Sequence, residues 1–186
     1  EHLDLFEMMQ RSVAALQDTV GSLNKILELK KSFDPKPQRA GLADTFTRVI
    51  DTMAPAIEAS GAVVRNNFEA SHSLPLQAAH LQSLLSNLLS NALKYDAAGR
   101  TPVVDFRLSL NEGVSRLAVL DNGRGINLDE YGSKVFGLFN RFDDSEDGTG
   151  VGLYIVRSIM TSCGGSVSVE SAIGEGTSFL LEFPGE

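Results

Sequence analysis

Residues 117–126 read LAVLDNGRGI, a short apolar run that ends at Asp121 and is followed by two closely spaced glycines. The apolar run predicts a buried strand, and Gly123 and Gly125 predict a sharp turn, because glycine adopts backbone angles that other residues avoid. A carboxylate at the end of a buried strand can accept a hydrogen bond from an exocyclic amine, such as that of adenine. An ordinary Asp-Asn-Gly turn would explain the same residues.

The segment upstream, LLSNLLSNALKY at 84–95, has the pattern of an amphipathic helix. Asn87 and Asn91 are four residues apart and therefore lie on one helical face, with Lys94 and Tyr95 one turn further on. The carbonyl oxygen of asparagine is a neutral, hard ligand, which suits a Mg²⁺ ion that also holds nucleotide phosphates. Asparagines on a solvated helical face would give the same pattern.

Downstream, VFGLFNRF at 135–142 places Phe136, Phe139 and Phe142 three residues apart. We expect these phenylalanines to form a short helix that packs into the core. Arg141 lies between them, and its planar cation could reach a phosphate group.

The next stretch is EDGTGVGLYIV, residues 146–156, in which Gly148, Gly150 and Gly152 precede a helical pattern. The first N–H groups of a helix have no intrahelical partner and bind phosphate with help from the helix dipole. An isolated G-x-G-x-G is weak evidence, and it matches neither a Walker A loop nor a Rossmann fingerprint.

The remaining periodicity predicts alternating helices and strands. Helices are expected over 43–60, where Pro55 should kink or interrupt the helix, over 76–95 and near 150–163. The expected strands are one at 62–69 and two hairpins made of residues 102–110 with 114–121 and 166–171 with 177–183. This mixture predicts an α+β fold, a layered sandwich with mixed or antiparallel strands.

Apolar residues near the N-terminus follow a heptad pattern of a and d positions. They are Phe6, Met9, Val13, Leu16, Val20, Leu23 and Leu27. One long coiled-coil-like helix is therefore expected over residues 1–33, ending before Pro35 and Pro37. We expect this seam to pack in a bundle or dimer; a helix packed on its own domain is the alternative. The second domain is expected to span residues 34–186.

The composition excludes several classes of protein. Hydrophobic residues make up 42% and charged residues 22% of the 186 residues, which is ordinary for a globular protein. The net charge of −8 argues against nonspecific nucleic-acid binding. One cysteine, Cys163, cannot form an internal disulfide and fits a reducing compartment, and with only three histidines it cannot complete a zinc finger. No apolar run is long enough to span a membrane.

Taken in order, five stretches resemble the catalytic ATP-binding domain of sensor histidine kinases of two-component systems. They are NLLSNALKY at 87–95, DNGRGI at 121–126, FGLFNRF at 136–142, GTGVGL at 148–153 and GEGTSF at 174–179. The resemblance covers residues 34–186 and implies an α/β sandwich of the Bergerat type, a mixed sheet packed on helices, which type II topoisomerases and mismatch-repair ATPases share.

The resemblance also implies roles for individual residues. Asn91 would bind Mg²⁺, with Asn87 on the phosphate side, and Asp121 would bind the adenine amine of ATP. Arg141 would contact the γ-phosphate. The other implied nucleotide contacts are Lys94, Tyr95, Gly123, Gly125, Gly148, Thr149, Gly150, Val151, Gly152, Leu153 and Thr177. Only the acidic stretch DDSED separates the phenylalanines from the glycines, which implies a short lid and a strong dependence on Mg²⁺.

The heptad helix resembles the second helix of the family's dimerisation and phosphotransfer hairpin. The resemblance implies a homodimer that transfers the γ-phosphoryl group to a histidine on a helix absent from this chain, for relay to the receiver domain of a response regulator. His2 lacks the family's acceptor context, and His72 and His80 are expected to be solvated or packed. The expected location is cytoplasmic, with no membrane or nucleic-acid contact by this chain. An anti-sigma-type serine kinase and a degenerate kinase domain that serves as a dimeric scaffold are the alternatives.

Overall fold

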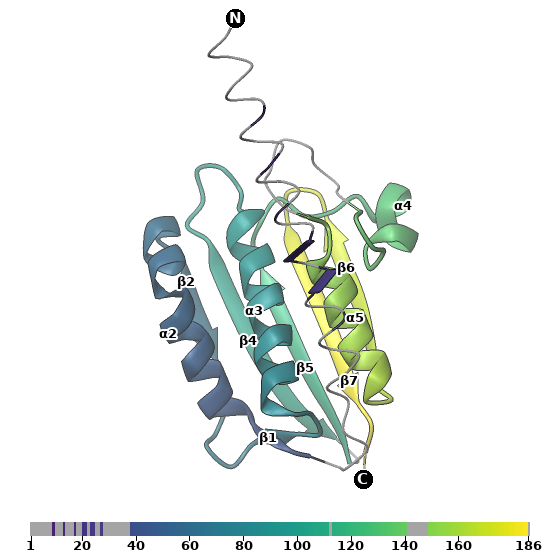
Figure 1. Cartoon of the computed structure of the whole chain (residues 1–186). Coiled ribbons are helices and arrows are strands. Elements are labelled where there is room, and N and C mark those ends of the chain that lie inside the picture. The colour runs from purple at the N-terminus through teal and green to yellow at the C-terminus, as the bar shows by residue number, and fades with distance from the viewer. Residues whose placement is uncertain are drawn as a thin grey trace, which may run out of the picture.

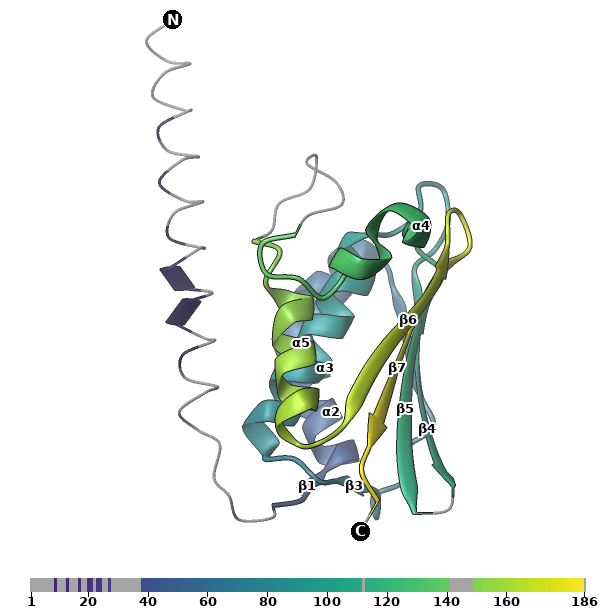
Figure 2. The same cartoon turned by 90° about the vertical axis from the view of Figure 1, so that its right-hand side faces the viewer.

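The computed structural model describes residues 38–111, 113–140 and 149–185, together with the isolated positions 9, 13, 17, 20, 21, 23, 24 and 27. A layer of helices covers one face of a sheet, and the two layers are seen edge-on in Figure 2. The helices of this layer are α2 (Leu42–Ser60), α3 (Ala78–Lys94) and α5 (Gly152–Ser162). The predicted α+β sandwich is confirmed.

The main sheet has the strand order β2-β4-β5-β7-β6 (Figure 1). Its strands are β2 (Val63–Asn66), β4 (Val103–Asn111), β5 (Val114–Asp121), β6 (Ser166–Ala172) and β7 (Gly176–Phe183). β2 runs parallel to β4 and the other neighbours are antiparallel, so the sheet is mixed, and both predicted hairpins are present. The smaller elements are β1 (Ala40–Gly41), β3 (Ser73–Leu74), α4 (Leu128–Tyr131) and the 3-10 helix η1 (Gly132–Lys134).

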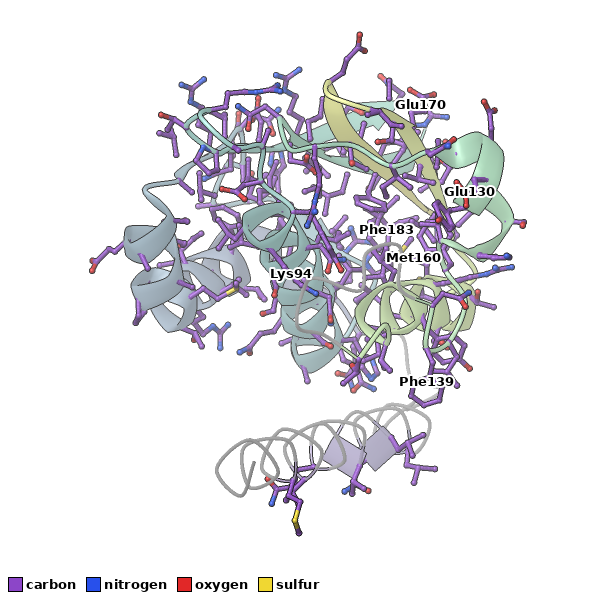
Figure 3. All side chains as sticks on the ribbon, turned by 90° about the horizontal axis from the view of Figure 1, so that it is seen from above. Lys94, Glu130, Phe139, Met160, Glu170 and Phe183 are labelled. Atoms are coloured by element: carbon purple, nitrogen blue, oxygen red, sulfur yellow. The ribbon has the colours of Figure 1, made fainter. Side chains whose placement is uncertain are left out.

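The core lies between the two layers. Alternate residues of β7 face the helices, and Phe179, Leu181 and Phe183 are at most 4% exposed. From the opposite layer, α5 contributes Met160, which Figure 3 shows on the same side of the sheet as Phe183, and α3 contributes a row of buried leucines. Burial of each such side chain stabilises the fold by about 1.5–3 kcal/mol. This packing fixes the ends of α3 and α5 relative to β5 and β7.

Helix α2 differs from the expectation at Pro55, because the helix continues through this residue instead of being interrupted. Proline removes one backbone hydrogen bond, that to the carbonyl of Asp51. Both Pro55 and Asp51 are exposed to solvent, so water can take the place of the missing donor.

The strand expected over 62–69 is shorter in the structure and ends at Asn66. The side-chain oxygen of Asn66 accepts a hydrogen bond from the backbone N–H of Phe68 at 3.0 Å. Such a local side-chain contact competes with the strand ladder and turns the chain.

The expected core helix around the phenylalanines is wrong for the described part of that segment, in which residues 135–139 form turns. The carbonyl of Lys134 accepts hydrogen bonds from the Gly137 N–H at 2.9 Å and from the Asn140 side chain at 2.8 Å, which closes a turn. Phe136 packs edge-to-face on Phe179, whereas Phe139 has a φ of 61° and is 46% exposed.

At the N-terminus, Phe6 and Leu16 of the predicted seam lie outside the described residues. The described seam residues are all helical and at least 41% exposed; they are Met9, Val13, Val20, Leu23 and Leu27. They therefore do not pack on the sandwich, and a separate dimerisation helix stays a prediction. Among the helices that the structure describes, none has the length and apolarity to cross a membrane.

Candidate functional site

A cavity of about 550 Å³ opens at one end of the sandwich. It is bounded by the C-terminal half of α3, the end of β5, α4 and the start of α5, which lie at the same end of the molecule in Figures 1 and 2. The predicted site residues that line it are Asn87, Asn91, Lys94, Tyr95, Asp121, Gly125, Thr149, Gly150, Gly152, Leu153 and Thr177. Residues as far apart in the sequence as Asn87 and Thr177 thus meet around one cavity.

Some predicted residues are placed differently. Gly123 and Val151 are not among the residues that line the cavity: Gly123 lies in the turn behind Asp121, and Val151 is 1% exposed at the start of α5. Arg141, Gly148 and the acidic stretch 143–147 lie outside the described residues, and their predicted roles stay predictions.

Asp121 lies at the end of β5, where two neighbouring segments hold its carboxylate. Its Oδ1 accepts hydrogen bonds from the backbone N–H of Gly123 at 2.8 Å and of Thr177 at 3.2 Å. Burial raises the pKa of Asp121 above its ordinary value, while these two N–H donors act in the opposite direction and only partly offset it. With Oδ1 occupied, the second oxygen is left to accept a hydrogen bond within the cavity.

The glycines of the turn after β5 allow close contact between main chains. Gly125 has a φ of 74°, and a Cβ atom there would overlap the carbonyl oxygen of Ala172. A Cβ at Gly123 would similarly overlap the carbonyl oxygen of Tyr95, which accepts a hydrogen bond from the Arg124 N–H at 3.0 Å. The turn therefore packs directly on the end of α3 and on the β6–β7 hairpin.

Two cationic side chains, those of Lys94 and Arg124, lie against the ring of Tyr95 at the edge of the cavity. The Lys94 ammonium lies 4.6 Å from the centre of the Tyr95 ring and donates to the ring hydroxyl at 3.0 Å. The Arg124 guanidinium lies 5.0 Å from the same ring centre. These contacts place two positive charges where an anionic ligand would be attracted.

The asparagines of α3 face the start of α5. The side-chain amide of Asn87 donates a hydrogen bond to the Ser83 carbonyl at 2.7 Å, and the Asn87 Oδ1 then faces Gly152. A Cβ atom at position 152 would lie only 2.8 Å from this oxygen. Gly150 has a φ of 67° and packs against the backbone of Asn140. Because the first N–H groups of a helix have no partner within the helix, this end of the cavity suits an anionic group.

Sequence reasoning missed part of the lining. The additional residues are Ser90, Arg124, Ile126, Asn127, Glu130, Tyr131, Val135, Asn140, Ile173 and Phe179. Phe179 could have been found, because it lies two positions after Thr177 and side chains two apart on a strand share a face. The short helix α4, which carries Glu130 at the rim (Figure 3), offers no comparable signal.

The family model described as histidine kinase-, DNA gyrase B- and HSP90-like ATPase matches residues 77–186. The aerobic respiration control sensor protein ArcB of Escherichia coli is 31% identical over 176 residues, which cover 88% of this chain and 22% of that protein. The methanogenesis regulatory histidine kinase FilI of Methanothrix harundinacea is 38% identical over 104 residues, 56% of this chain and 12% of that protein. The chain therefore spans about a fifth or less of these relatives.

Solved structures show the same fold. A mycobacterial sensor histidine kinase, MprB, aligns with a TM-score of 0.68 and 24% identity over 81% of this chain and 99% of that chain. Full-length ShkA in complex with AMPPNP aligns with a TM-score of 0.73 and 22% identity over 100% of this chain and 39% of that chain.

Proposed function

Because the chain belongs to the histidine kinase-, DNA gyrase B- and HSP90-like ATPase family, as the catalytic ATP-binding domain of a sensor histidine kinase, we propose that its cavity binds Mg·ATP for phosphoryl transfer to a histidine. The observation that supports this most directly is the position of Asp121, which is held by two backbone donors beside Thr177 in a cavity of about 550 Å³.

The base of the nucleotide would lie at Asp121. An ionised carboxylate accepts hydrogen bonds only, which suits the 6-amino group of adenine. Phe179 and Ile126 line the same cavity and offer apolar surface for the ring, and the Gly125 turn allows close approach. Together these residues would orient the nucleotide with its phosphates toward α5.

The phosphates would lie between α3 and the start of α5. Thr149, Gly150 and Gly152 line this end of the cavity, where the helix dipole favours negative charge. Lys94 and Arg124 add positive charge along one side. In phosphoryl transfer the protein acts mainly by positioning the nucleotide and neutralising charge, and these groups are suited to both tasks.

A Mg²⁺ ion fits this site if the nucleotide supplies most of its ligands. Asn91 lines the cavity and offers one hard amide oxygen, and the described residues contain no cluster of acids, histidines or cysteines that could hold a metal ion by themselves. Mg²⁺ commonly takes one or two protein ligands together with phosphate oxygens and water. Asn91 would thus hold the ion only together with bound nucleotide, and the ion would supply charge neutralisation.

The acceptor histidine would belong to a helix outside this chain. His80 is 2% exposed on α3, and burial lowers its pKa. His72 accepts a hydrogen bond from the Glu69 N–H at 3.0 Å and directly precedes β3, which lies at the end of the sandwich away from α4 (Figure 2). His2 lies outside the described residues. A phosphorylated acceptor helix would then pass the group to a receiver domain of a response regulator.

Transfer of labelled phosphate tests this assignment. The chain incubated with Mg²⁺ and γ-labelled ATP is expected to acquire no acid-labile phosphate, whereas addition of a dimerisation hairpin with an acceptor histidine should produce labelled hairpin. Asn91→Ala should lower the initial rate of labelling at least tenfold, because the ion loses its protein ligand. The matched control is Asn111→Ala, since Asn111 is exposed and lies outside the cavity. Acid-labile label on this chain alone would contradict the assignment.

We further propose that the exposed N-terminal seam pairs two chains. Leaving apolar side chains such as Val20 and Leu23 in water is unfavourable, and burial would recover about 1.5–3 kcal/mol for each. The wild type is expected to be a dimer at micromolar concentration by light scattering, and Val20→Glu with Leu23→Glu should make it a monomer. Ser22→Glu, outside the heptad seam, should leave the dimer intact. A monomeric wild type, or a dimeric double variant, would contradict this proposal.

A further inference from the structure

Ser171, near the end of β6, joins three segments behind the cavity. Its hydroxyl oxygen accepts a hydrogen bond from the Ile126 N–H at 2.8 Å and donates to the Gly176 carbonyl at 2.7 Å. The same oxygen lies 3.1 Å from the hydroxyl oxygen of Thr177, where either group could be the donor. Ser171 is half-buried and does not line the cavity itself.

The direction of the Ser171–Thr177 hydrogen bond follows from the other two contacts. A serine hydroxyl has one proton and two acceptor lone pairs. The carbonyl of Gly176 can only accept, so it takes the proton of Ser171 in the shorter contact. The remaining bond must then run from Thr177 to Ser171. With the Ile126 N–H on the second lone pair, every hydrogen-bonding position of Ser171 is filled.

This direction determines what Thr177 offers to a ligand. Thr177 lines the cavity, and its proton is held by Ser171, so its oxygen presents only lone pairs. Asp121 beside it is likewise an acceptor when ionised, with Oδ1 held by the Gly123 and Thr177 N–H groups. In this corner of the cavity, the side chains of Asp121 and Thr177 therefore both accept hydrogen bonds from a ligand, and neither offers it a proton.

We propose that Ser171 is a positioning residue that determines base specificity: by holding the Thr177 proton, it makes the base corner an acceptor for a 6-amino purine and unfavourable for a 6-oxo purine. The inference rests on the proposed binding of ATP in this cavity. A 6-oxo group would meet acceptors at both Asp121 and Thr177, and neither side chain could donate a proton to it directly. Without the Ser171 hydroxyl, the hydroxyl group of Thr177 could rotate and donate its proton to the 6-oxo group.

The test compares ATP with inosine triphosphate, which carries a 6-oxo group and the same ribose and triphosphate. Isothermal titration of both nucleotides in Mg²⁺ gives the ratio of their dissociation constants. Ser171→Ala should lower the preference for ATP roughly tenfold, whereas Ser171→Thr, which keeps the hydroxyl, should retain most of it. The matched control is Ser168→Ala, an exposed serine on the same strand and outside the cavity, which should leave the ratio unchanged.

A double-mutant cycle separates positioning from support of the fold. Thr177→Val should also lower the preference, and Ser171→Ala added to it should change the ratio no further, because the hydroxyl to be oriented is gone. An equal loss of affinity for both nucleotides in Ser171→Ala, or an unchanged ratio, would overturn the inference while leaving ATP binding established. A wild type that binds neither nucleotide would overturn the proposed function as well.

Discussion

Replacement of Asp121 by asparagine is expected to weaken ATP binding roughly 100-fold. The asparagine keeps an oxygen for the Gly123 and Thr177 N–H groups, which hold Oδ1 of the wild-type carboxylate. Its amide nitrogen then occupies the position of the second oxygen and presents a donor to the 6-amino group of adenine. Two donors face each other in a partly desolvated corner, so both the hydrogen bond and its charge assistance are lost. Isothermal titration with ATP in Mg²⁺ measures the change.

The thermal stability of this variant distinguishes loss of binding from loss of folding. Burial raises the pKa of Asp121, so the folded domain prefers the protonated carboxyl. The stability that protonation adds is present below the ordinary pKa of aspartate and is lost as the pH rises through the higher folded pKa. At pH 7 the buried, ionised carboxylate thus lowers the free energy of unfolding, and asparagine removes this destabilisation. The melting temperature of the variant should therefore be equal to or above that of the wild type. A variant that melts earlier, or binds ATP as the wild type does, would contradict this account of Asp121.

Replacement of Gly176 by alanine is expected to destabilise the domain by on the order of 3 kcal/mol. Gly176 has a φ of 115°, and a Cβ there would overlap the main-chain oxygen of Asp121 and lie 2.9 Å from the Cα of Asn122. Because β5 and β7 are paired at this point, with Asp121 opposite Thr177, the strands would have to separate. The melting temperature followed by circular dichroism should fall by roughly 6–12 °C.

Gly174 provides the matched control for this prediction. It lies in the same turn with a φ of 84°, but a Cβ there would meet no atom within 4 Å. Gly174→Ala should therefore cost only the backbone strain, about 1 kcal/mol. If the two variants melted at the same temperature, the close approach of Gly176 to the end of β5 would not determine the stability of the site.

Much of the architecture could be predicted because it depends on local patterns. The apolar run ending at Asp121 and the amphipathic spacing of residues 84–95 correspond to β5 and α3, whose ends line the cavity. The order of the short stretches predicted the family, which the match over residues 77–186 shows. Secondary structure and family membership depend on residues that are close together in the sequence, so both can be predicted from the sequence alone.

The features that could not be predicted depend on contacts between distant segments. Phe139 shares the three-residue spacing of Phe136, and only the turn closed by Lys134 shows that Phe139 is exposed. Ser171 belongs to a network with Ile126 and Thr177, and nothing near it in the sequence predicts this partnership across 45 positions. Spacing indicates which side chains share one element, whereas hydrogen-bond direction requires the three-dimensional arrangement.

Titration of the wild-type chain with ATP in the presence of Mg²⁺ tests the central claim most directly. The cavity is expected to bind one ATP per chain with a dissociation constant between micromolar and millimolar, roughly 4–8 kcal/mol of binding free energy. The position of Asp121, held by Gly123 and Thr177 at the end of β5, predicts that this binding requires the adenine base. Heat consistent with this affinity, lost in Asp121→Asn, is the predicted result. A folded wild type that binds no ATP under these conditions would contradict the account.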